Sequence, residues 1–255
     1  MHPPVDPAAV DPPIERAAAL VKAATRIAVL TGAGVSAESG IPTFRDADGL
    51  WEGHPVEQVA YPDAFLHDPA MVWRFYNARR ENLRRVEPNA GHHALARLEG
   101  RLGSDRFTLI TQNVDDLHRR AGSRSVVELH GNLSRTRCTG CRRIEDGGLE
   151  SLGELPKCPH CGALIRPDVV WFTEALPDDA WDVASAAAES CDCFLIVGTS
   201  AVVYPAAGLI GTARHGQAKV IEFNKQRTDA SHLADVNVFG PSGQSLPAVV
   251  DRAMS

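Results

Sequence analysis

The stretch VLTGAGVSAESGIPTFR, residues 29–45, decides the fold of this 255-residue chain. It begins as the end of an apolar strand, continues through a Gly32-x-Gly34 turn and then starts a helix. Such a turn lets backbone N–H groups approach a pyrophosphate at the positive end of a helix. The stretch therefore predicts a dinucleotide-binding turn at the end of a strand.

The helix that follows this turn is cut short at residues 39–42, SGIP. Proline lacks a backbone donor and disfavours helical geometry in the residue before it, so the helix has barely two turns. A dehydrogenase would place a second strand, ending in an acidic ribose-binding residue, about twenty residues further on. Here the next strand-like run starts only at residue 107. The break favours a mobile loop over a nucleotide, with Phe44 and Arg45 able to reach the site, and argues against hydride transfer.

Strand-like and helix-like segments alternate along the rest of the chain. Short β-branched runs predict buried strands at residues 26–30, 107–110, 126–129, 194–197 and 220–223, with a weaker one at 235–239. Helical patterns lie near residues 14–24, 69–86, 90–102, 114–121, 178–190, 203–214 and 244–254. This alternation is typical of an α/β protein with a Rossmann-like, doubly wound parallel sheet.

Two segments interrupt the alternation. Residues 46–88 carry aromatic-rich loops and a helix, and residues 132–168 carry paired cysteines. We expect these two insertions to join into a smaller lobe. The Rossmann-like domain would then comprise, after a disordered tail at residues 1–13, residues 14–45, 89–131 and 169–255.

Four of the six cysteines form two C-x-x-C pairs that are separated by 16 residues. Two such pairs supply four thiolates in tetrahedral geometry, which suits one structural zinc ion and leaves no open position for catalysis. A redox C-x-x-C motif would not explain the second pair. The predicted zinc ligands are Cys138, Cys141, Cys158 and Cys161. Cys191 and Cys193 flank a buried strand and are expected to be inert core thiols.

The composition limits the classes of partner. With 44% hydrophobic residues and a formal net charge of −6, the chain can bury a core but has no general attraction to nucleic acid or acidic lipid. The start of the chain has neither the basic region nor the apolar run of a signal peptide. No apolar run approaches the ~18 residues of a membrane span. We therefore expect a soluble, cytoplasmic protein with no nucleic-acid or membrane partner.

Polar residues follow four of the predicted strands. In open α/β sheets, ligands bind beyond the carboxyl ends of the strands, so these residues should share one crevice with Gly32 and Gly34. Among them, His130 directly follows an apolar strand. An imidazole with an ordinary pKa near 6.5 is a suitable general base at neutral pH. The predicted polar strand ends are residues 111–116, 130–132, 198–200 and Asn224.

Taken together, the motifs GAGVSAESGIPTFR, TQNVDDLH, HGN, VVWFTE, GTS and EFN, with the paired cysteines, resemble the sirtuin family of NAD-dependent protein-lysine deacylases. The resemblance runs from about residue 20 to 250 in family order. It implies that NAD is a co-substrate, that His130 is the general base, and that Asn113 and Asp115 hold the ribose and nicotinamide. The residues that it places around NAD are Gly32, Ala33, Gly34, Phe44, Arg45, Gln112, Asn113, Asp115, Gly198, Thr199, Ser200, Asn224 and Ser242.

The resemblance also implies a mechanism. The carbonyl oxygen of an acyl-lysine attacks the nicotinamide ribose as nicotinamide leaves, His130 activates a ribose hydroxyl, and the products are lysine, nicotinamide and O-acyl-ADP-ribose. An extended run would pair with the substrate backbone as an added strand, a mode that accepts many substrate sequences. That run is Val169, Val170, Trp171 and Phe172.

A further feature concerns the acyl group. Tyr76 and Arg79 lie three residues apart and so project from one face of a helix. They resemble the Tyr-x-x-Arg pair of the sirtuin branch that removes succinyl, malonyl and glutaryl groups, in which arginine grips the distal carboxylate. Ala60 matches the small residue that makes room for the larger group. Without the family, the same residues would indicate only an exposed basic helix.

Three other functions remain open from the sequence: mainly deacetylation, protein ADP-ribosylation on the same scaffold, or a non-catalytic NAD or ADP-ribose sensor. Arg79 and an intact acyl-lysine channel favour a deacylase over an ADP-ribosyltransferase. The presence of His130, Asn113 and Asp115 together argues against a sensor, which needs no base at the ribose. A zinc-ribbon DNA-binding protein is disfavoured by the acidic balance. Acylated-lysine proteins are the expected substrates, and a monomer is favoured.

Overall fold

The core of the protein is a six-stranded parallel sheet. The structure is a computed structural model that describes residues 12–42, 50–51 and 54–255. The strand order, β11-β10-β9-β1-β4-β5, is that of a dinucleotide-binding doubly wound sheet, with the chain reversing direction beside β1. The strands are β1 (Ile27–Thr31), β4 (Phe107–Thr111), β5 (Val126–Glu128), β9 (Cys193–Val197), β10 (Lys219–Asn224) and β11 (Val236–Phe239). The predicted fold class is confirmed.

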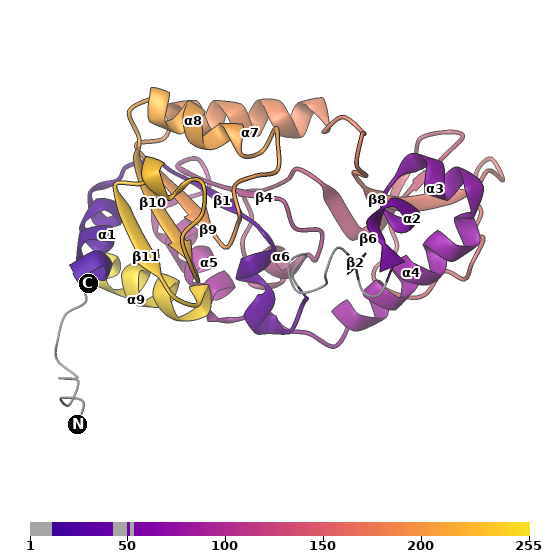
Figure 1. Cartoon of the computed structure of the whole chain (residues 1–255), viewed down its shortest axis with the longest axis horizontal. Coiled ribbons are helices and arrows are strands. Elements are labelled where there is room, and N and C mark those ends of the chain that lie inside the picture. Colours follow the sequence, from indigo (N-terminus) through magenta and orange to yellow (C-terminus); the bar gives the residue numbers. More distant parts are fainter. Residues whose placement is uncertain (1–11, 43–49, 52–53) are drawn as a thin grey trace.

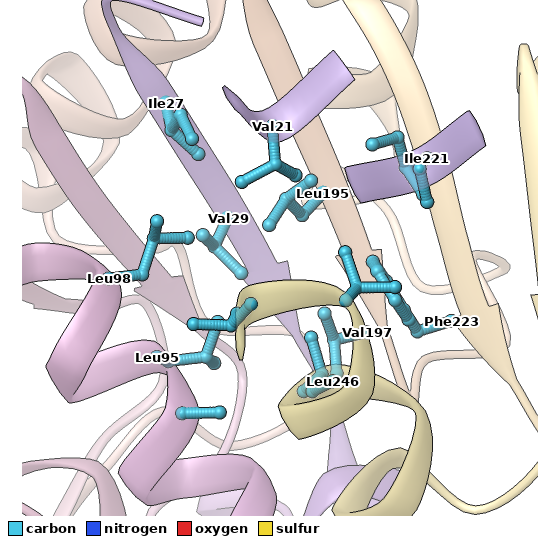
Figure 2. Close-up of a cluster of buried hydrophobic side chains, with 14 of the residues drawn as sticks. Val21, Ile27, Val29, Leu95, Leu98, Leu195, Val197, Ile221, Phe223 and Leu246 are labelled. Carbon is cyan, nitrogen blue, oxygen red and sulfur yellow. The ribbon is translucent and has the colours of Figure 1, made fainter. Parts of the chain in front are cut away.

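Helices cover both faces of this sheet (Figure 1). On one face lie α1 (Pro12–Ala23), α5 (Ala90–Leu102) and α9 (Ser242–Met254), and on the other α7 (Asp178–Ser190) and α8 (Gly208–His215). Successive residues of β1 therefore enter different cores, with Val29 in the first and Leu30 in the second. Figure 2 shows Val21, Leu95 and Leu246 of the three helices around Val29, Leu195 and Val197 of the strands.

A smaller lobe lies at the end of the molecule away from α1 and the C-terminus (Figure 1). It contains α2 (Val56–Val59), α3 (Pro62–His67) and α4 (Pro69–Leu83), the hairpin β2 (Leu50–Trp51) and β3 (His54–Pro55), and a three-stranded antiparallel sheet of β6 (Gly131–Cys138), β7 (Ile144–Asp146) and β8 (Ile165–Val169). Trp73 and Tyr76 of α4 share one core with Leu133 of β6 and Trp171 beyond β8. Both insertions thus bury their apolar faces against each other, while the proposed domain boundaries stay a prediction.

Arg80 links α4 by hydrogen bonds to the insertion at residues 132–168, which carries the paired cysteines. Its side chain is fully buried, and its guanidinium donates to the carbonyl oxygens of Leu133, Gly148 and Glu150. A guanidinium donates in a fixed planar fork, so three carbonyl groups at fixed positions hold it in one orientation. Arg80 therefore forms a buried polar link between the two insertions.

Several boundaries differ from those expected. The first helix begins at Pro12, because proline is tolerated in the first turn of a helix, and residues 1–11 of the expected tail lie outside the described residues. The helix expected after Gly34 is a pair of 3-10 helices, η1 (Ala33–Val35) and η2 (Ala37–Ser39), which end at Gly40 with φ +90°. α6 (Leu117–Arg120) and α8 are shorter than predicted because loops precede them, and a third 3-10 helix, η3 (Ser231–Leu233), follows β10.

Among the described residues, no helix combines the length and the apolar character that crossing a membrane requires. The cytoplasmic location expected from the sequence stays a prediction.

Candidate active site

A cavity of about 890 Å³ opens at the carboxyl ends of β1, β4, β9 and β10 and extends to the small lobe. Every described residue that the sequence assigned to NAD, catalysis or substrate contributes to its lining, although the residues come from distant parts of the chain. Phe44 and Arg45 lie outside the described residues. We name the part at the strand ends, around Gln112, Asn113 and His130, the ribose end, and the part around Ala60, Tyr76, Arg79 and Trp171 the acyl end.

The glycines of the opening turn are required by close backbone packing between β1 and β9. A Cβ on Gly32 would lie 2.7 Å from Cβ of Thr199, and a Cβ on Gly34 would lie 2.6 Å from the carbonyl oxygen of Gly198. Gly198 itself has φ +58° and would place a Cβ 2.3 Å from the Val35 nitrogen. The turn therefore presents bare backbone to the cavity, which fits a pyrophosphate.

Polar contacts continue around the same strand ends. Gln112 Nε2 donates to Thr199 Oγ1 at 3.1 Å, and Asn224 Nδ2 donates to the Thr199 carbonyl at 2.6 Å. The Ser242 hydroxyl is buried in the cavity wall and has no hydrogen-bond partner in the part of the chain that the structure describes. A buried hydroxyl without a partner is costly, so this atom fits the polar group of a bound dinucleotide.

A directed chain of hydrogen bonds holds the acidic group of the ribose end. The Asn89 N–H donates to His92 Nδ1 at 3.2 Å, so the neutral imidazole carries its hydrogen on Nε2 and donates to Ser36 Oγ at 3.3 Å. Asn113 Nδ2 also donates to Ser36 Oγ, and the Ser36 hydroxyl donates to Asp115 Oδ2 at 2.7 Å. Burial raises the pKa of the Asp115 carboxyl, and burial lowers the pKa of His92 to about 4. The chain fixes both the orientation and the proton positions of this wall.

A second buried histidine lies behind the first. The His118 and His92 rings are 4.8 Å apart, and His118 Nε2 lies 3.0 Å from Thr31 Oγ1. The Thr31 hydroxyl donates to Thr111 Oγ1, which in turn accepts from the Asn113 N–H at 3.0 Å. These positioning residues were not predicted from the sequence. Only Asn89-x-x-His92, a capping-box arrangement at the start of α5, carried a local signal.

His130 has the geometry of a general base. Its Nδ1–H donates to the Gln112 carbonyl at 2.9 Å, which leaves the lone pair of the neutral ring on Nε2. Burial lowers the pKa of His130, and the hydrogen bond to Gln112 opposes this shift. The imidazole is therefore neutral at pH 7 and able to accept a proton in the cavity that it lines.

The acyl end is formed by aromatic rings and one cation. Tyr76 is 1% exposed, and its hydroxyl accepts a hydrogen bond of 2.9 Å from the indole N–H of Trp171. The Arg79 guanidinium lies 5.9 Å from the Tyr76 ring centroid. Ala60, which is 3% exposed, lines the same part of the cavity. Tyr76 and Arg79 thus face the cavity together, as their spacing predicts.

The run expected to bind a substrate strand already uses its N–H groups. The Val170 N–H donates to the His130 carbonyl, the Trp171 N–H to Glu174 Oε2 and the Phe172 N–H to the Ala60 carbonyl. Only Val169 belongs to a strand, β8. The carbonyl oxygens of Val169 and Trp171 also accept hydrogen bonds, from Arg166 and from the Glu174 N–H, and the pairing of this run with a substrate strand stays a prediction.

The two cysteine pairs come together at the tip of the small lobe. The four Sγ atoms all lie within 4.8 Å of one another. Those of Cys138 and Cys161 are 3.4 Å apart, and those of Cys141 and Cys158 are 3.7 Å apart. Tetrahedral zinc with Zn–S bonds of about 2.3 Å places its sulfurs about 3.8 Å apart. The cluster fits one structural zinc ion. Cys191 and Cys193 are buried in the sheet cores, as expected for inert thiols.

Comparison with known proteins gives consistent matches. The model of the Sir2 family matches residues 32–205. An NAD-dependent protein deacylase of Thermococcus kodakarensis is 49% identical over 92% of this chain and 94% of its own length. A solved Sir2 homologue in complex with NAD superposes with a TM-score of 0.87 at 43% identity, covering 94% of this chain and 93% of that one. Sir2Af2 bound to a myristoylated histone peptide gives a TM-score of 0.75 at 34% identity, covering 94% of this chain and 96% of that one.

Proposed function

This chain belongs to the Sir2 family and is an NAD-dependent protein deacylase, and we propose that it acts preferentially on lysines that carry acidic acyl groups. Succinyl, malonyl and glutaryl groups are the expected substrates, with weaker activity on acetyl. The observation that carries this proposal is the placement of Tyr76 and Arg79 beside Ala60 at one end of the cavity.

The physical basis is charge recognition in a buried site. A distal carboxylate offers the Arg79 guanidinium an anionic partner for charge-assisted hydrogen bonds, which a methyl group does not. Hydrogen bonds to charged groups contribute about 1.5–3 kcal/mol, or roughly ten- to hundred-fold in rate. The Tyr76 hydroxyl supplies a second polar contact on the same helix face. An acetyl group would engage neither.

The residues of the ribose end have the following proposed roles. When bound, NAD supplies an electrophilic ribose carbon with nicotinamide as the leaving group. The backbone of the Gly32–Gly34 turn faces the pyrophosphate, and the Asn113 amide and Asp115 carboxyl orient the ribose and nicotinamide. His130 Nε2 accepts the proton of a ribose hydroxyl. One water molecule is consumed, and the products are nicotinamide, lysine and O-acyl-ADP-ribose.

The test uses one lysine peptide in acetylated and succinylated forms, incubated with the protein with and without NAD and analysed by mass spectrometry. We expect the succinyl group to be lost well ahead of acetyl, only with NAD, and with O-succinyl-ADP-ribose formed. Loss of acetyl alone would leave the family assignment intact and remove the acidic-acyl preference. ADP-ribosylated peptide in place of deacylated peptide would favour the transferase. Loss of neither group and no modification would favour a sensor.

A further inference from the structure

The hydroxyl of Tyr76 is held by a residue from a distant part of the chain. The Trp171 indole N–H donates to it at 2.9 Å, and both side chains are at most 3% exposed. Tyr76 belongs to α4, whereas Trp171 lies in the run that follows β8. This contact therefore links the helix that carries the acyl-end residues to the run that was expected to bind substrate backbone.

The direction of this hydrogen bond restricts the phenol. An indole N–H can only donate, whereas a phenol hydroxyl carries one hydrogen and two acceptor positions. Trp171 thus occupies an acceptor position of Tyr76, and the phenol hydrogen must point elsewhere. Burial raises the pKa of Tyr76, so the hydroxyl keeps its hydrogen at neutral pH. Tyr76 and Arg79 line the same cavity, with the guanidinium carbon 5.9 Å from the phenol ring centroid, so one ligand there can meet both donors.

We propose that Trp171 is a specificity-determining positioning residue, which commits the Tyr76 hydroxyl as a hydrogen-bond donor to the distal carboxylate of an acidic acyl group. A carboxylate accepts at both oxygens and donates at neither, so it matches a site in which Tyr76 and Arg79 both donate. This inference deepens the proposed acyl preference and rests on it. The substrate class that it favours is carboxylate-terminated acyl-lysine.

Contacts to both the indole ring and the backbone of Trp171 hold this residue in place. The Arg166 guanidinium carbon lies 3.4 Å from the Trp171 ring centroid, a cation–π contact, and Arg166 forms a two-pronged ion pair with Glu174 at 2.6 and 2.9 Å. Glu174 also accepts the backbone N–H of Trp171, and the Phe65 ring lies 5.5 Å from the indole. A side chain fixed in this way keeps its N–H aimed at Tyr76 before any substrate arrives.

The test is a double-mutant cycle on acyl selectivity. Trp171→Phe keeps an aromatic ring and removes the N–H, and it is made in the native protein and in a Tyr76→Phe background. The readout is the ratio of kcat/KM for a succinyl-lysine peptide to that for the acetyl-lysine peptide. We expect Trp171→Phe to lower this ratio about three- to ten-fold, mainly through KM for the succinyl peptide, since a neutral hydrogen bond contributes about 0.5–1.5 kcal/mol. In the Tyr76→Phe background the same change should leave the ratio as it is.

Trp73→Phe is the matched control. Trp73, which lies on α4, is also a buried tryptophan. Its indole N–H donates to the Ile165 carbonyl instead of to a phenol. Its replacement costs an equivalent hydrogen bond and should leave the succinyl-to-acetyl ratio unchanged. If Trp171→Phe destabilises the fold, the benzothiophene analogue of tryptophan at position 171 keeps the ring size and removes only the N–H.

Two results would overturn the inference: an unchanged ratio in Trp171→Phe, or an equal fall in the Tyr76→Phe background. Arg79→Met separates this failure from that of the proposed function. If the native protein prefers succinyl and Arg79→Met removes that preference while Trp171→Phe does not, only the inference about Trp171 fails. If the native protein shows no succinyl preference and Arg79→Met leaves the ratio unchanged, the proposed function fails and the inference with it.

Discussion

The two ends of the cavity are constructed differently. At the ribose end, polar side chains from the carboxyl ends of parallel strands bind one another, so that Ser36 alone contacts His92, Asn113 and Asp115. At the acyl end, one helix face and one extended run place a cation and a phenol among aromatic rings. The first arrangement is stiff and interdependent, whereas the second has few polar partners. The chemical step and the acyl selectivity should therefore respond to different substitutions.

Removing the zinc ligands should have the largest effect, because it acts on the lobe that carries the acyl end. Cys141→Ser leaves three thiolates, and structural zinc contributes about 10–16 kcal/mol in small zinc domains. We expect loss of bound zinc, measured by elemental analysis, and loss of the near-UV signal of Trp73 and Trp171. Cys191→Ala is the control, since Cys191 lies outside the cluster. A zinc-free Cys141→Ser protein with native stability would contradict a structural role.

Replacing the proposed base should act on the ribose end alone. His130→Ala removes a general base, which contributes about 10²- to 10⁴-fold in rate. Turnover of succinyl and acetyl peptides should fall by the same factor, while the thermal unfolding curve stays that of the native protein. A fall confined to one acyl group, or retained turnover, would place the base elsewhere.

Low pH should destabilise the protein through the ribose end, where His92 is buried. Because burial lowers the pKa of His92 to about 4, the unfolded chain binds a proton below the ordinary value near 6.5 that the folded chain does not. The free energy of unfolding is therefore unaffected by His92 above pH 6.5. It falls by about 2–3 kcal/mol as the pH falls toward 4. Urea unfolding at pH 7 and pH 4.5 measures the total loss, to which His118 and His130 also contribute because burial lowers the pKa of both. His92→Gln should remove that part of the pH dependence, and an unchanged dependence in this variant would contradict the assignment.

The smallest expected change is also the most selective. Arg79→Met should lower the ratio of succinyl to acetyl kcat/KM about ten- to hundred-fold, because it removes a contact of about 1.5–3 kcal/mol that only an acidic acyl group makes. Steady-state kinetics with both peptides provide the measurement. A parallel loss of both activities would indicate that Arg79 supports the cavity in general and does not recognise the carboxylate.

The same contrast explains what the sequence could predict. Periodicity and turn residues located the six strands of the parallel sheet, α5 and α7, but not the strands of the small lobe. The rule that ligands bind at strand ends grouped Gln112, His130 and Asn224 in one cavity. The acyl-end contact of Trp171 with Tyr76 joins residues 95 positions apart, which no local pattern encodes. Likewise, the link from His92 to Ser36 exists only because α5 packs beside the opening turn. A short 3-10 pair replaced the expected helix after Gly34 because close contact with Gly198 holds the backbone there.

Two adjacent arginines on α4 have opposite consequences for how this protein can diversify. Arg79 contributes to the cavity lining, whereas Arg80 is fully buried and donates to carbonyl groups of β6 and of the loop after β7. Libraries randomised at positions 76 and 79 should yield folded variants with new acyl preferences, whereas randomising position 80 should yield mostly unfolded chains. Substitutions that change the substrate are thus compatible with folding at position 79 and incompatible with it at position 80.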